Sequence, residues 1–218
     1  MQAQAAPGLG IVVTSSTSLE QPFPTARRFA TLDEFTGGRI GWNIVTGSTA
    51  QVTEGLFGVS HYDHDTRYDV ADEFVDLCRT LWEDCWEDDA VRFDLDGDVL
   101  IDPDRVHEID YRSEHFSSRG LFKVPPGPQR TPVLFQAGAS GRGRDFGARN
   151  AEAMFTQGQN KEQARAASQD IRARVAAAGR DPHDLRILSG VTVTVAETAD
   201  EAAAKRRELE DLFSSDDA

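Results

Sequence analysis

The sequence predicts an α/β fold built on a parallel sheet. Short apolar runs rich in β-branched residues alternate along the chain with stretches whose apolar residues recur every three or four positions. Strands and helices that alternate in this way form parallel sheets with right-handed crossovers. Of the 218 residues, 39% are hydrophobic and 28% charged, a composition typical of a globular protein with one substantial core. We therefore expect a single α/β domain over residues 1–218.

The first βαβ unit lies near the N-terminus. The continuous apolar run Gly8–Val13 predicts a buried parallel strand, and the cluster of hydroxyl residues that begins at Thr14 marks its end. Pro24 suits the first turn of the following helix, which Gly37 stops. A second strand is predicted over Arg39–Val45.

The most regular helical pattern runs from Thr66 to about Trp86. Apolar residues at steps of three and four form one stripe: Val70, Phe74, Leu77, Cys78, Leu81 and Cys85. The two cysteines in this stripe are seven residues apart, a spacing unlike that of a CxxC redox motif. Two cysteines are also too few for a disulfide framework. We expect two buried free thiols.

An insertion is predicted over Glu87–Arg130. It spans roughly forty residues, longer than the connections that compact barrels usually tolerate without a functional reason. The Asp96-Gly97 pair and short alternating runs within it favour a hairpin. We interpret the segment as an inserted hairpin that forms a lid.

The repeating pattern then resumes. Further strands are expected over Thr131–Gln136, Ala153–Thr156 and Leu185–Val195. Further helices are expected over Asp145–Ala151, from the capping pair Asn160 and Gln163 to Gly179, and over Ala199–Phe213 behind the capping pair Thr198 and Glu201. Five strands suit an open doubly wound sheet or a TIM barrel, and a complete barrel needs eight strands and typically about 250 residues.

Charge and hydropathy exclude several classes of partner. The formal net charge of −14 opposes binding to nucleic acid or to anionic membranes. No apolar run approaches the roughly 18 residues of a membrane span, and the first residues lack the basic and apolar parts of a signal peptide. These features predict a cytoplasmic protein.

Two segments carry candidate chemistry. The glycine-rich turn from Gln136 to Gly143 joins a strand to a helix, where backbone N–H groups can approach an anion such as a phosphate. Ser140 can add a hydroxyl and Arg142 a charge, or either can point to solvent. The cluster His61-Tyr62-Asp63-His64-Asp65 contains metal-ligating residue types, but no distant ligand accompanies it and we assign no metal site.

Four blocks of sequence, in order, resemble the nitrilotriacetate monooxygenase component A family, a branch of the bacterial-luciferase-like flavin-dependent monooxygenases. The blocks are VVTSSTSLEQPFPTARRFATLDEFTGGRIGWNIVTG, HDTRYDVADEF, LWEDCWEDDA and PVLFQAGASGRGRDFGARNAEAMFT. The resemblance spans about Gly8 to Leu212. It implies a partial TIM (β/α)8 barrel of the luciferase-like type, with about five of the eight strands, in a chain that lacks both ends of the family's domain.

The resemblance also implies roles for individual residues. It implies contacts with flavin mononucleotide (FMN) from Thr14, His64 and Tyr68. From their positions at a strand end and in the glycine-rich turn, we add Asn43, Ala139 and Ser140 as expected FMN contacts. We also hypothesise that His64 is the catalytic residue, which stabilises a flavin peroxide or shuttles a proton. Without the resemblance, Thr14 would be read as an ordinary strand end, Tyr68 as a packing residue and His64 as solvated.

The activity implied by the resemblance is that of a two-component monooxygenase. Reduced FMN (FMNH2) diffuses from a separate NAD(P)H-dependent flavin reductase, reacts with O2, and oxygenates a small organic substrate. A homo-oligomer is expected. Two alternatives remain: a non-catalytic truncated barrel with weak or no flavin binding, and a deazaflavin-dependent oxidoreductase.

Overall fold

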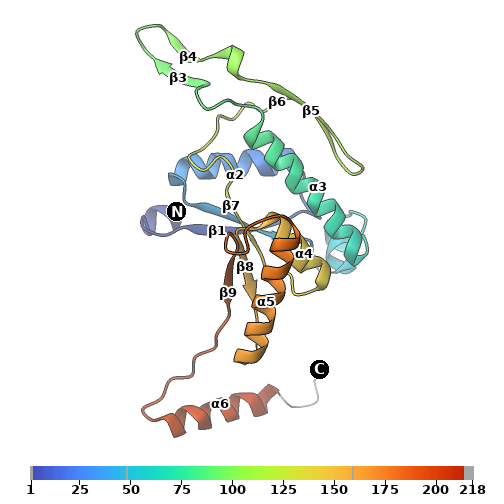
Figure 1. Ribbon diagram of the computed structural model, residues 1–218, viewed down its shortest axis with the longest axis vertical. Helices are drawn as coiled ribbons and strands as arrows, with labels where there is room; N and C mark the ends of the chain where they lie inside the picture. Colours follow the sequence, from blue (N-terminus) through green and yellow to red (C-terminus); the bar gives the residue numbers. More distant parts are fainter. Residues whose placement is uncertain (1, 48, 159, 214–218) are drawn as a thin grey trace.

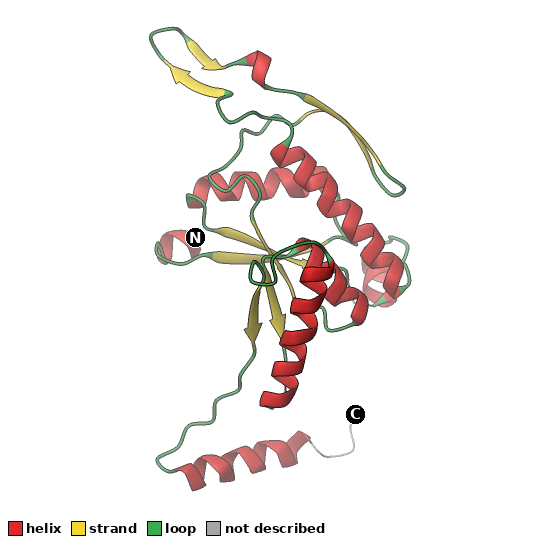
Figure 2. Ribbon diagram, viewed as in Figure 1, coloured by secondary structure: helices red, strands yellow, loops and turns green. Residues whose placement is uncertain are grey.

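The computed structural model describes residues 2–47, 49–158 and 160–213. Within these residues, five parallel strands form one sheet in the order β1-β2-β7-β8-β9, as the alternating pattern predicts (Figures 1 and 2). The strands are β1 (Ile11–Ser16), β2 (Ile40–Val45), β7 (Val133–Gln136), β8 (Ala153–Thr156) and β9 (Arg186–Ser189). The helices are α1 (Gln2–Ala5), α2 (Pro22–Thr36), a π-helix (Gln51–Leu56), α3 (His64–Glu83), α4 (Gly141–Asn150), α5 (Lys161–Ala177) and α6 (Ala199–Phe213).

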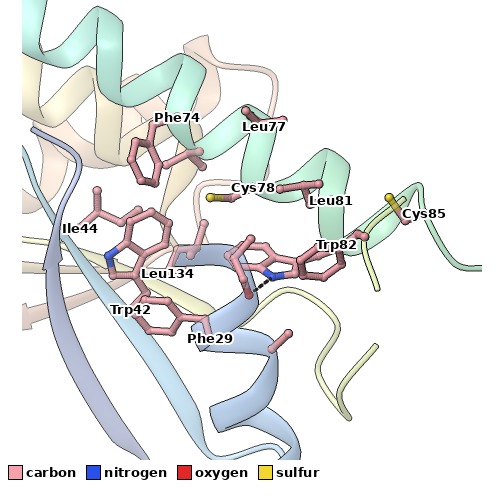
Figure 3. Close-up of a cluster of buried hydrophobic side chains, with 14 of the residues drawn as sticks. Phe29, Trp42, Ile44, Phe74, Leu77, Cys78, Leu81, Trp82, Cys85 and Leu134 are labelled. Atoms are coloured by element: carbon pink, nitrogen blue, oxygen red, sulfur yellow. Dashed lines mark hydrogen bonds between the residues drawn. The ribbon is translucent and has the colours of Figure 1, made fainter. Parts of the chain in front are cut away.

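Helices α2 and α3 cover one face of the sheet around Trp42 of β2 (Figure 3). The Trp42 ring centre lies 5.4 Å from that of Phe29 on α2 and 5.8 Å from that of Phe74 on α3. Trp82 of α3 donates from its indole nitrogen to the Ala26 carbonyl of α2, at 2.9 Å, so the polar edge of this buried ring is satisfied. The predicted apolar stripe of α3 is buried here, and both cysteines are buried free thiols, as expected.

Within the part of the chain that the structure describes, no helix covers the opposite face of the sheet (Figure 1). Side chains alternate along each strand, so Thr14 and Asn43 point away from the helices while their neighbours Val13 and Trp42 pack towards them. The apolar members of this open face are partly exposed: Val12 (44%), Val133 (37%), Phe155 (43%) and Leu188 (44%). In a closed barrel such a face would line the interior.

Local signals in the sequence account for several helix ends. Gly37 ends α2 in the left-handed conformation, at φ 63°, and its N–H bonds back to α2. Asn160 caps α5 by accepting from the Gln163 N–H at 2.9 Å. Thr198 accepts from the Glu201 N–H at 3.2 Å, which confirms the predicted start of α6.

The insertion contains two hairpins where the sequence predicts one. These are β3 (Val91–Asp94) with β4 (Val99–Ile101), and β5 (Glu108–Arg112) with β6 (Ser117–Leu121), joined through a 3₁₀ turn (Pro103–Arg105). The first turns at the predicted Asp96-Gly97 pair. The second was missed because β6 (SSRGL) has Leu121 as its only apolar residue besides a glycine, so the partner strand of β5 shows no alternating pattern.

The second hairpin folds back along α3, as Figure 1 shows. Tyr111 donates to the Asp76 carboxylate at 3.0 Å, and Ser113 donates to the Glu73 carboxylate at 2.7 Å. Phe116 packs edge-on against Phe74, with ring centres 5.6 Å apart. These contacts hold the insertion against the helix it follows.

Three predicted boundaries are wrong by a few residues. The first strand is Ile11–Ser16 rather than Gly8–Val13, so Thr14 lies inside it and not at its end. Helix α4 begins at Gly141 rather than Asp145, because Ser140 caps it. The last strand ends at Ser189 rather than Val195, since only residues 186–189 pair with β8.

Among the described residues, no helix has both the length and the apolar character needed to cross a bilayer.

Replacing Phe74 with Ala should lower the free energy of unfolding by about 3–5 kcal/mol, because the ring is fully buried between the sheet and the second hairpin. Urea unfolding followed by tryptophan fluorescence measures the change. Phe35→Ala is the matched control, since Phe35 is 82% exposed, and should stay within about 0.5 kcal/mol of the parent. Equal effects of the two substitutions would contradict the assigned core.

The pKa of Tyr111 is raised to about 12 by burial and by the neighbouring Asp76 carboxylate. Its folded pKa exceeds the ordinary value of 10.0, so this contribution to stability is complete below pH 10 and is lost as the pH rises towards 12. An absorbance titration at 295 nm should show a late tyrosine component that Tyr111→Phe removes and Asp76→Asn shifts to lower pH. An unchanged titration in Tyr111→Phe would refute the assignment.

Candidate functional site

The candidate site lies at the edge of the sheet where the parallel strands end. The segments after β1, β2 and β7 leave this edge, and α4 begins directly after β7. Because α3 leads back from β2 to the start of β7, its N-terminus with His64 lies at the same edge. This is the edge at which parallel barrels carry their chemistry.

Tyr68 of α3 sits in the glycine-rich turn between β7 and α4. A Cβ placed on Gly138 would lie 2.9 Å from the Tyr68 hydroxyl oxygen and 2.9 Å from the Cα of Gly143. A Cβ on Gly143 would lie 2.6 Å from the same hydroxyl oxygen. The two glycines therefore let the backbone close around the end of this side chain, which is only 6% exposed.

The N-terminus of α4 is shaped for an anion. The Ser140 hydroxyl caps the helix by accepting from the Gly143 N–H at 3.0 Å, while Ala139 and Gly141 beside it are exposed. The N–H groups at the start of a helix have no acceptor within the helix, and the helix dipole favours negative charge there. The predicted residues Ala139 and Ser140 thus border a set of donors that suits a phosphate.

Arg142 pairs with α3 through Nη2 of its guanidinium, while its buried Nη1 atom makes no hydrogen bond within the described residues. Its guanidinium lies 5.6 Å from the Tyr68 ring centre and donates to Asp69 and Asp72 of α3, at 2.7 Å each. Burial alone would lower the pKa of Arg142, but the hydrogen bonds to Asp72 and Asp69 outweigh it and raise that pKa. Arg142 thus forms a clamp between α4 and α3.

The carboxylate of Asp72 is the part of this clamp that sequence reasoning missed. It also accepts from Arg149 at 2.6 Å and from the Asn150 side chain at 2.7 Å, both near the end of α4. Asp69 and Asp72 are three residues apart and so share one face of α3, a signal that looks like an ordinary solvated helix face in the sequence.

His64 lies beside Tyr68 at the mouth of the site. The two ring centres are 5.3 Å apart, and the His64 side chain is half exposed. Its Nδ1 atom is 2.7 Å from the Asp65 carboxylate, which leaves Nε2 to face other groups. Asp63 caps α3, and its hydrogen bond from the Thr66 side chain lowers the pKa of the Asp63 carboxyl.

Thr14 and Asn43 form a second polar pair on the open face of the sheet. They are register partners on β1 and β2, and the Asn43 amide donates to the Thr14 hydroxyl at 3.1 Å. Gln136 on the next strand is buried, with its side chain turned back to the Gly138 N–H. The structure thus brings together Tyr68, His64 and the glycine-rich turn as one group, and Thr14 with Asn43 as another.

A cavity of about 340 Å³ lies in the insertion, not at this edge. Trp86, Ile101 and Val106 line the cavity near the C-terminal end of α3. His64 is the first residue of α3, and the 20 residues of this helix span about 30 Å, so the cavity and His64 lie at opposite ends of it. The cavity lining is apolar apart from Lys123, and none of the residues expected to contact FMN is among the residues that line it. We place the candidate site at the strand ends, where Tyr68, His64 and the glycine-rich turn meet.

Comparison with known proteins identifies the family. The sequence profile described as "Luciferase-like monooxygenase" matches residues 2–215, nearly the whole chain. The chain belongs to the luciferase-like monooxygenase family.

Curated relatives of this luciferase-like chain include the long-chain alkane monooxygenase of Geobacillus thermodenitrificans and nitrilotriacetate monooxygenase component A of Aminobacter aminovorans. The first is 42% identical over 94% of this chain and 47% of its own length, and the second 37% identical over 95% and 46%. The chain therefore spans about half the length of these relatives. The resemblance to nitrilotriacetate monooxygenase component A is confirmed.

Solved structures confirm the barrel type. A riboflavin lyase structure with modified FMN and riboflavin superposes with a TM-score of 0.91 at 42% identity, over 96% of this chain and 47% of that one. The long-chain alkane monooxygenase superposes with a TM-score of 0.88 over 97% and 49%. The five-stranded sheet is thus part of a luciferase-like TIM barrel.

Gly138→Ala should lower the free energy of unfolding by about 1–3 kcal/mol, because the added methyl group would meet the Gly143 backbone and the Tyr68 hydroxyl. Gly141→Ala is the control, since nothing lies within 4 Å of a Cβ there, and should change stability by less than about 0.5 kcal/mol. Urea unfolding of both variants measures the difference. Equal stability of the two variants would show that Tyr68 does not fill the turn.

Proposed function

We propose that this chain is the FMN-binding part of a two-component monooxygenase, with His64 as the catalytic residue. The enzyme would take FMNH2 from a separate NAD(P)H-dependent flavin reductase and use O2 to oxygenate a small organic substrate. The observation that carries the proposal is the seating of Tyr68 against the glycine-rich turn that opens α4. Family membership and the 37–42% identity to monooxygenases named above support it.

The residues present fit FMN at both of its ends. Backbone donors beside Ala139 and Ser140 suit a phosphate monoester, which carries close to two negative charges at neutral pH. The hydroxyl of Thr14 and the amide of Asn43 are donors and acceptors on an otherwise apolar face, where a flat ring can lie with its polar edge towards them. Tyr68 stands between the turn and His64.

Each side chain then has a defined task. The α4 N-terminus binds the phosphate, and Thr14 with Asn43 orients the ring. Tyr68 fills the space between α3 and the glycine-rich turn and so fixes the distance between them. His64 presents Nε2 as the site of proton transfer, with Asp65 orienting the imidazole through Nδ1. Reduced flavin supplies the activation of O2. The turn of the second hairpin contacts Tyr62: the ring centres of His115 and Tyr62 are 6.2 Å apart. This contact limits the access of water to the site from that side.

A non-catalytic partial barrel is the second candidate, and one observation favours it. The open sheet face exposes Val12, Phe155 and Leu188, and the outer edges of β1 and β9 have no strand partner in the described residues. Uncovered faces and edges of this kind promote association, which also agrees with a homo-oligomer. In this case flavin would bind weakly or not at all.

Titration of the full chain with FMN, followed by flavin fluorescence, tests the proposal. We expect saturable binding that Thr14→Val weakens up to about tenfold, because one hydrogen bond to the ring is lost. Thr31→Val is the matched control: Thr31 donates to the Arg27 carbonyl within α2, outside the site, and its loss should leave binding unchanged.

Absence of binding at high micromolar protein would reject the proposal in favour of the partial barrel. Equal weakening by Thr14→Val and Thr31→Val would place the flavin elsewhere on the chain.

A further inference from the structure

The turn of the second hairpin meets α3 at a cluster of three metal-ligating side chains. Glu73 comes from the middle of α3, and Glu114 and His115 come from the turn between β5 and β6. One ligand atom from each lies within 4.8 Å of the others. Among the described residues this is the one group of three that meets such a criterion, and the His61–Asp65 segment does not form one.

The Nδ1 atom of His115 is the feature that points to a ligand. This atom is buried, although the His115 side chain as a whole is 18% exposed, and its contact with the Glu73 carboxylate oxygen, 3.1 Å away, is an ion-pair contact rather than a well-aligned hydrogen bond. The carboxylate already accepts from the Ser113 hydroxyl at 2.7 Å and from the His115 backbone N–H at 2.8 Å. A buried ring nitrogen without a hydrogen bond is costly unless another group satisfies it.

The spacing of the two atoms suits a shared ion. Two ligands at about 2.0–2.1 Å from a tetrahedral zinc ion are about 3.4 Å apart. The 3.1 Å between His115 Nδ1 and the Glu73 oxygen is close to that edge length. Glu114 is exposed and can turn to supply a third ligand, and water can complete the shell.

We propose that Glu73, Glu114 and His115 bind one divalent transition-metal ion, of which Zn²⁺ is the representative. One imidazole and two carboxylates suit zinc better than magnesium or calcium, which prefer oxygen ligands alone. The ligands are about forty residues apart in sequence, so the ion would join the insertion to α3. A search of the sequence for closely spaced ligands does not find this site, because Glu73 lies far along the chain from Glu114 and His115.

The location gives the ion a structural role next to the flavin site. His115 packs edge-on against Tyr62, two residues before His64, and Phe116 packs on Phe74. Fastening the turn at Glu73 would hold the second hairpin beside the mouth of the site. Metal binding itself does not require flavin, so the two proposals fail separately.

The test is a calorimetric titration of the full chain with ZnCl₂ after EDTA treatment and its removal. We expect one strong site, weakened by about tenfold or more in His115→Ala and measurably weakened in Glu114→Gln. His107→Ala is the matched control, because His107 pairs with Glu87 at 2.8 Å on an exposed surface but lies outside the three-ligand group. Zinc should also slow hydrogen exchange of residues 108–121 in the parent and in His107→Ala.

Glu114→Gln keeps the test independent of folding, because Glu114 is exposed. No zinc bound by the parent chain would overturn the proposal, and so would unchanged affinity in both His115→Ala and Glu114→Gln. Stronger weakening by His107→Ala than by His115→Ala would place the ion at the other histidine and reject this site.

Discussion

The packing of α3 on the sheet is the contact on which the rest of the molecule depends. Trp42 of β2 fills the space between the helices and the sheet, and Phe74 and Trp82 of α3 lie against it. Because α3 runs back across the sheet, this packing sets the position of Tyr68 at one end of the helix and of the insertion at the other. The candidate flavin site and the candidate metal site therefore share one rigid support.

Much of the fold could be predicted because its signals are local and periodic. The stripe through Val70, Phe74 and Leu81 defines α3, and the capping residues Asn160 and Thr198 mark the starts of two later helices. The end of the last strand could not be predicted. Val191, Val193 and Val195 alternate as a strand would, but they are 74–83% exposed in the structure because no neighbouring strand pairs with them.

The candidate site was only partly accessible to sequence reasoning. The glycine-rich turn predicts an anion site from its composition, but the seating of Tyr68 between Gly138 and Gly143 depends on two segments about seventy residues apart. The ion pairs of Arg142 could not be predicted for the same reason, since Asp69 and Asp72 meet it only in the folded chain. The FMN contacts expected of Thr14 and His64 came from family resemblance, and the geometry adds the Thr14–Asn43 hydrogen bond and the edge-on contact of His64 with Tyr68.

The central claim is that the strand ends and the open sheet face of this partial barrel form one FMN site, with phosphate at the α4 N-terminus and the ring beside Thr14 and Asn43. Diffraction from crystals of the full chain soaked with FMN tests it most directly. The account predicts difference density for a phosphate within hydrogen-bond distance of the backbone N–H groups of Ser140 and Gly141, and for a ring over the Thr14–Asn43 pair. Ordered FMN density elsewhere, such as in the apolar cavity beside Trp86 and Ile101, would contradict it.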